Sequence, residues 1–261
     1  MSGPQFSRAT CEKRYGCSAI RVETTRVIRK RVLKIFSLKL FLGLLLILGF
    51  SGSVVAQEIT GQGRRLIKLL DGMNVEQLWL PYQKVYWRTG RPRGEPVNDG
   101  KPHTHCSAFV AAAAEKLGVY ILHPPEHSTI RLANAQADWL SRKGENYGWR
   151  AVRTPEEAQQ LANSGVLVVA VYKERLPRRS GHIAIVRPKV KTLKLIREEG
   201  PQITQAGLEN YASTSLKQGF KHHKGAWKKR EVRFYSHAVN WEACRADIRR
   251  TAFFFSSISR A

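Results

Sequence analysis

Hydrophobic positions follow a helical period over the first part of the chain. Apolar residues recur at helical spacing between residues 58 and 80, ahead of a proline. Good helix formers then run from Ser107 to Leu117, and Gly118 stands where a C′ glycine would end a helix. The segment 132–140 is again amphipathic. These patterns predict three successive helices.

The period changes in the second half of the chain. Thr154-Pro155-Glu156-Glu157 is typical of a helix start, and Asn163-Ser164-Gly165 ends that helix. A β-branched run then predicts a buried strand at 166–172. Further strands are expected at 182–188, at 201–207 and at 234–239. Helices followed by an antiparallel meander predict an α+β domain with helices packed on a small antiparallel sheet.

The N-terminal region has the pattern of a secretory signal. A basic stretch precedes the apolar run 40–50, which is too short to span a bilayer easily, and small residues follow with Val54 and Ala56 at the −3 and −1 positions. We expect cleavage after Ala56; the alternative is an uncleaved anchor. The leader is long for a signal, so a start near Val27 or Val32 fits better than Met1. The predicted organisation is a leader at 1–56, a domain at 57–240 and a C-terminal helix or tail at 241–261.

The chain is strongly basic. Its formal net charge is +24, of which residues 1–56 contribute +8. Such an excess favours an anionic partner, here a cell-wall polymer or a membrane surface, although a scattered, solvated positive surface is the alternative. Residues 217–233 are the densest basic stretch, and His222-His223 within it is interpreted as a solvated loop. A secretion signal and the lack of a nucleic-acid-binding motif argue against nucleic acid. Nothing in the sequence indicates the oligomeric state.

Cys106 begins the helix that runs to Leu117. The unpaired N–H groups and the positive end of a helix dipole favour thiolate over thiol there. A backbone N–H at Cys106 or Ser107 is also free to face an oxyanion. This is where a cysteine hydrolase needs its nucleophile. The alternative is that Cys106 is a small apolar residue buried under a helix.

The other cysteines leave Cys106 with one possible disulfide partner. Cleavage of the leader removes Cys11 and Cys17, so the mature chain keeps Cys106 and Cys244. A disulfide between these two is the structural alternative in an oxidising compartment. Cys106 begins a helix and Cys244 lies in a remote C-terminal stretch, which favours a free, reactive thiol.

A thiolate nucleophile needs a base and a group that orients it. His182 opens a strand directly after Gly181, where its ring can project from the sheet edge toward a helix N-terminus. Gln205, about one strand later, can hold the second ring nitrogen through its side-chain carbonyl.

The order of these motifs resembles the NlpC/P60 and CHAP cysteine peptidases and amidases. It consists of Cys106 in HCSAFVAAAAEKLGV, His182 in SGHIAIVRP and Gln205 in ITQAG, over roughly residues 80–220. The resemblance implies a papain-like fold, with Cys106 as nucleophile, His182 as base and Gln205 as the third member, where the family more often has His, Glu or Asn. Gln202 is the alternative third member. An upstream tyrosine in this family assists the oxyanion, which makes Tyr86 a further candidate, beside ordinary cleft packing.

The resemblance further implies a secreted, periplasmic enzyme that hydrolyses a peptide or amide bond of peptidoglycan or its stem peptides. No cofactor is implied. The main alternative is a non-catalytic, basic wall-binding module with a degenerate papain-like fold, in which Cys106 is buried, unreactive or paired with Cys244. A metal site is a weaker alternative, because the available ligand types lack CxxC or HExxH spacing; they are His103, His105, Cys106, His123, His127 and His182.

Overall fold

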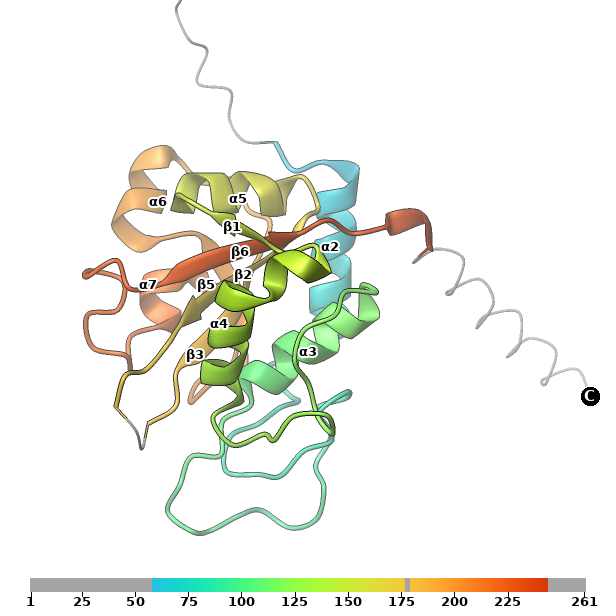
Figure 1. Cartoon of the computed structure of the whole chain (residues 1–261), viewed down its shortest axis with the longest axis vertical. Coiled ribbons are helices and arrows are strands. Elements are labelled where there is room, and N and C mark those ends of the chain that lie inside the picture. The colour runs from blue at the N-terminus through green and yellow to red at the C-terminus, as the bar shows by residue number, and fades with distance from the viewer. Residues whose placement is uncertain (1–57, 177–178, 244–261) are drawn as a thin grey trace, which may run out of the picture. The chain divides into compact units, whose positions relative to one another are not determined.

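A computed structural model describes residues 58–176 and 179–243 (Figure 1). The leader predicted at 1–56, Cys244 and the rest of the predicted tail lie outside these residues. The helices that are described are α2 (Gly61–Gly72), α3 (Cys106–Lys116), α4 (Leu132–Arg142), the 3-10 helix η1 (Gly144–Tyr147), α5 (Pro155–Asn163), α6 (Leu193–Glu199) and α7 (Leu216–Gly219). No helix within this part of the chain is long and apolar enough to cross a membrane.

The strands form one antiparallel sheet in the order β1-β6-β2-β3-β4-β5. Their bounds are β1 (Arg150–Val152), β2 (Leu167–Tyr172), β3 (His182–Val186), β4 (Gln202–Gln205), β5 (Tyr211–Ser215) and β6 (Arg233–His237). The predicted α+β class with a small antiparallel sheet is therefore confirmed.

The sheet is a meander only from β2 to β5. The last strand, β6, returns to the far side of β2, where Tyr235 pairs with Val169, and β1 pairs with the outer edge of β6. The simple meander expected from the sequence is thus incomplete, because the pairing of β6 with β2 joins segments about sixty residues apart, and no local pattern specifies it.

Side chains alternate between two cores on the two faces of the sheet. Leu167, Val169 and Val171 of β2 lie in a core with α3 and α4, and Ile183 and Ile185 of β3 join them. The intervening residues of both strands pack in a second core with α5 and α7; they are Val168, Ala170, Ala184 and Val186. Figure 1 shows α3 and α4 near the lower half of the sheet and α5 at its upper edge. The site residues come from both sides of this layer.

Local end signals explain the helices that the sequence predicts well. The Thr154 hydroxyl accepts a hydrogen bond from the Glu157 N–H (3.1 Å), with Pro155 in the first turn of α5. Gly118 has φ +67°, which a C′ glycine requires at the end of α3. The helix expected within 58–80 ends at Gly72, and Met73–Leu80 form turns.

Candidate active site

Cys106 is the first residue of α3, directly after a long loop. No side chain caps this helix start, because the N-cap residue His105 makes no capping hydrogen bond. The His105 ring instead donates from Nε2 to the carbonyl of Gln83 (2.6 Å), and burial lowers its pKa. This bond ties the loop ahead of α3, which extends below the sheet in Figure 1, to the start of the helix. The first-turn N–H groups of α3 therefore face the thiol without a side-chain competitor.

The Cys106 thiol is free, 5% exposed, and surrounded by backbone N–H groups. The N–H groups of Ile183, Ser107 and Cys106 itself, with the Ser107 hydroxyl, act to lower its pKa. Burial acts in the opposite direction and is the larger effect, so the pKa of Cys106 is raised above its usual value. The thiolate expected at this helix start is thus wrong for the structure as it stands: Cys106 is a neutral thiol.

His182 and Gln205 are joined as the sequence predicts. The His182 Nε2 lies 2.8 Å from Gln205 Oε1, and both side chains are buried (5% and 2% exposed). The Gln205 amide nitrogen donates to the Glu209 carbonyl (3.0 Å), which can only accept. Gln205 Oε1 must then face His182, whose Nε2 must carry the proton. The lone pair of neutral His182 is therefore on Nδ1, the nitrogen that can act as a base.

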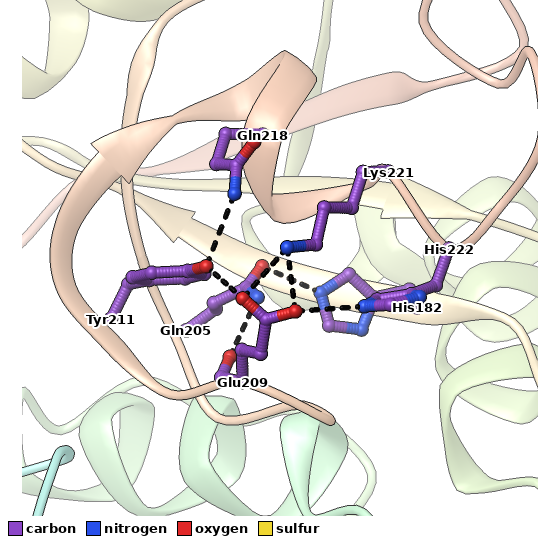
Figure 2. A network of polar contacts seen from close by, with 7 residues as sticks. All are labelled: His182, Gln205, Glu209, Tyr211, Gln218, Lys221 and His222. Carbon is purple, nitrogen blue, oxygen red and sulfur yellow. Dashed lines mark hydrogen bonds and ion pairs between the residues drawn. The ribbon is translucent and has the colours of Figure 1, made fainter.

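Glu209 anchors the loop that holds Gln205 (Figure 2). Its carboxylate accepts hydrogen bonds from the Tyr211 hydroxyl, the Lys221 ammonium (2.7 Å) and the His222 ring (3.2 Å). These donors, Lys221 first, lower the pKa of Glu209 to about 2. Gln218 of α7 also donates to the Tyr211 hydroxyl (3.1 Å). The network links β5 and the segment after α7 to the backbone that fixes the Gln205 amide.

Phe220 and His223 cover the His182 ring. Phe220 makes an edge contact with it (centroids 4.7 Å apart), and His223 stacks on it (5.4 Å apart, 22° between planes). Burial lowers the pKa of both histidines to about 4, so both rings are neutral at neutral pH. The interpretation of His222-His223 as a solvated loop is wrong, since one packs on His182 and the other binds Glu209.

Cys106 and His182 approach the start of β3 from its two sides. The thiol contacts the N–H of Ile183, whose side chain lies in the core with α3. His182 precedes Ile183, pairs with Tyr172, and packs on Phe220 of the second core. Within the part of the chain described, no hydrogen bond joins the thiol to the imidazole. The structure therefore joins the base, His182, to its orienting amide. It places the Cys106 thiol against the N–H of Ile183, the residue after His182, without a hydrogen bond between the thiol and the imidazole.

The remaining candidate residues differ in whether they contact the thiol or His182. Ser107 lies beside the thiol, through its N–H and its hydroxyl. Gln202 donates from Nε2 to the Ser213 hydroxyl (2.9 Å), so Gln205, not Gln202, is the amide that contacts His182. Tyr86 is 56% exposed in the loop before α3, and its one ring contact given by the structure is with Arg93. It is thus not brought to the thiol by any contact described.

Three amide side chains that the sequence did not single out hold the site together. Asn134 accepts hydrogen bonds from the N–H groups of Glu174 and Gly181 (3.1 and 3.0 Å), which fixes the chain entering β3. Asn210 accepts from the Gly207 N–H (2.9 Å) and donates to the Val75 carbonyl (2.7 Å).

Gln136, fully buried, binds the Ser107 and Leu122 carbonyls (3.2 and 2.9 Å) and thereby holds the first turn of α3. Of the three amides, it alone had a sequence signal. It is a polar residue on the apolar face of α4, at a position four after Leu132.

In residues 58–176 and 179–243, no three His, Cys, Asp or Glu side chains are grouped so that they could hold a metal ion. The described residues therefore offer no site of the kind that the metal alternative requires. His103 instead pairs with Asp99 (2.8 Å).

No protein-family model matches the chain, and no curated protein matches it either.

Proposed function

We propose that the protein is a secreted cysteine peptidase or amidase with a papain-like fold, which acts in the periplasm on a peptide or amide bond of peptidoglycan. One observation carries the proposal. The Gln205 amide, fixed by the Glu209 carbonyl, holds His182 with Nδ1 as its basic nitrogen, and the Cys106 thiol contacts the N–H of the next residue, Ile183. A thiol at an uncapped helix start and an oriented base are the two parts that acyl transfer to cysteine requires.

The chemistry follows from these two groups. His182 Nδ1 accepts the Cys106 proton as Sγ attacks the carbonyl carbon, and the oxyanion is bound by N–H groups at the start of α3. The imidazolium then gives the proton to the departing amine, which leaves a thioester on Sγ. Water attacks the thioester while Nδ1 takes its proton, and the returning proton restores the thiol as the acid product leaves.

Catalysis in this scheme requires His182 Nδ1 and the thiol to come within hydrogen-bond reach. Both groups are neutral and covered in the structure. The neutral pair is compatible with attack, because the proton transfers during the step rather than before it. Because Cys106 lies in the core with α3 and His182 packs on Phe220 of the second core, the start of β3 must move before the ring and the thiol can meet.

Removal of the thiol tests the proposal. Insoluble peptidoglycan is incubated with the wild-type chain and with Cys106→Ala, and the release of soluble fragments is measured. We expect release by the wild type and background release by the variant. Gln160→Ala, at an exposed position of α5, is the matched control and should keep full activity. Equal release by wild type and Cys106→Ala would contradict the proposal.

A non-catalytic wall-binding module is the second candidate, and a specific observation favours it. The thiol is buried, protonated and not hydrogen-bonded to His182. Such a module predicts that peptidoglycan is bound but not cut, and that Cys106→Ala leaves binding unchanged. The digestion above separates it from the enzyme.

A further inference from the structure

A concave feature lies at one end of the sheet, and Cys106, His182 and Gln205 are not among its lining residues. It is a groove of about 1680 Å³ where β1 and β2 finish and β6 begins. Its walls come from α4, the segment after β2, α6, and the loop Trp227–Val232. None of the three candidate catalytic residues lines it, so its lining is available for a separate role.

The groove is rich in cations that have no acidic partner. Its lining includes nine Lys or Arg and five Asp or Glu side chains. Three of the cations are used in ion pairs, namely Lys173 with Asp138, Arg175 with Glu231 and Arg197 with Glu156. The other six form no ion pair with any residue that the structure describes: Arg153, Lys217, Lys228, Lys229, Arg230 and Arg233. An exposed concentration of unpaired like charge attracts an anion.

The groove begins beside the candidate active site. His182, the first residue of β3, pairs across the sheet with Tyr172, the last residue of β2. His223 stacks on His182 and also contacts the Tyr172 ring (5.1 Å). Lys173 and Glu174, the next residues along the chain, already line the groove. Part of the groove lining is therefore adjacent in the chain to Tyr172, the residue that pairs with His182.

We propose that this groove binds the carboxylate-bearing strand of peptidoglycan next to the bond that is cut. The inference rests on the proposed function for the identity of the polymer, but not for the binding. A concave surface accommodates a polymer chain better than it accommodates a flat lipid surface. Glu174 and Glu198 of the lining form no ion pair with any residue in the described part of the chain. Because unpaired carboxylates repel anions, these two residues disfavour the dense phosphates of nucleic acid more than a ligand with widely spaced carboxylates.

Aromatic residues in the groove also argue against single-stranded nucleic acid. Phe234 and Tyr235 are buried, and the Trp227 indole donates to the Glu198 carbonyl (3.3 Å). Trp227 is half-buried, and a single indole falls short of the successive stacking surfaces that single-stranded nucleic acid uses. The contacts available to a ligand are therefore mainly those of Lys and Arg side chains.

Binding is measured with the full chain carrying Cys106→Ala, so that hydrolysis plays no part. Co-sedimentation with insoluble peptidoglycan is compared for two triple variants of this background. Lys217→Gln, Lys228→Gln and Lys229→Gln remove three groove charges, while Lys68→Gln, Lys116→Gln and Lys143→Gln remove three exposed charges elsewhere. Both triples lower the net charge equally, so a difference between them reports location alone.

We expect the groove triple to weaken binding about tenfold or more at low salt, with a flatter salt dependence, and the control triple to change it about twofold or less. Equal weakening by the two triples, or no change with either, overturns the proposal. A fluorescent DNA duplex is the second probe. If the groove triple loses duplex binding and keeps peptidoglycan binding, the groove is a nucleic-acid site and the proposal is overturned. Failure of peptidoglycan hydrolysis by the wild type refutes the enzyme without altering these results.

Discussion

Proton positions at His182 follow from one chain of hydrogen bonds. A backbone carbonyl fixes the Gln205 amide, the amide fixes the ring tautomer, and Nδ1 is left as the base. The sequence predicted Gln205 as the partner of His182 but not the tautomer of the ring. The tautomer depends on the backbone carbonyl of Glu209, and a backbone group leaves no signal in the sequence. The sequence likewise did not predict the raised pKa of Cys106, since burial depends on residues far away in the chain.

Gln205→Ala tests this chain at a single residue. The change leaves the buried Nε2–H of His182 without its acceptor, which costs about 1–3 kcal/mol of stability. It also frees the ring to adopt the wrong tautomer, so we expect peptidoglycan hydrolysis to fall at least about tenfold, part of what a positioned base contributes. Gln202→Ala removes the same side chain from the same strand and should keep nearly full activity. Equal losses in the two variants would show that Gln205 has no special role.

Stability in mild acid is predicted to depend on the two stacked histidines. Their folded-state pKa values, about 4, lie below the unfolded value of about 6.5, so the unfolded chain binds more protons between these limits. Stability is therefore full above about pH 6.5 and falls as the pH drops toward 4.

His223→Phe keeps a ring on His182 but removes one of the two titrations. Urea unfolding at pH 7 and pH 5 should show a smaller acid loss for this variant than for the wild type. An unchanged loss would mean that His223 is not buried on His182 in solution.

The elements with strong local signals were predicted, and those at edges were missed. The start of α5 and the strands β2 and β3 carry capping residues or continuous apolar runs. β5 has the sequence YASTS with no buried residue, and β1 has only three residues, so neither shows a strand pattern. The short helices α6 and α7 were not predicted. Of these, α7 matters most to the site, because it carries Gly219 against Gln205.

Gly219→Ala tests the contact between α7 and β4. A Cβ there would lie 2.5 Å from both Gln205 Oε1 and Ile203 Cδ1, so Gln205 would have to move away from His182. We expect a loss of about 1–3 kcal/mol in unfolding free energy and a fall in hydrolysis. Gly72→Ala, at the end of α2 with nothing within 4 Å, is the matched control and should be neutral or slightly stabilising. A stable, fully active Gly219→Ala would show that the close packing is not needed.

At the scale of the molecule, the candidate active site and the basic groove share one end of the sheet. β3 begins there with His182, β2 finishes with Tyr172, and β6 begins with Arg233. Six Lys and Arg side chains that form no ion pair with a described residue gather in this groove, whereas the sequence left open whether the positive charge meets an anionic partner or is scattered over the surface. The position of Arg233 at this end of the sheet depends on the pairing of β6 with β2, which the sequence did not predict.

Detection of a thioester on Cys106 is the most direct test of the central claim. Peptidoglycan is digested by the wild-type chain with and without hydroxylamine, and the products are identified by mass spectrometry. A thioester partitions between water and hydroxylamine, so the account predicts that the new carboxylate is partly replaced by a hydroxamate, and that Cys106→Ala gives neither product. Digestion that persists in Cys106→Ala, or a wild type that binds peptidoglycan and releases nothing, would contradict it.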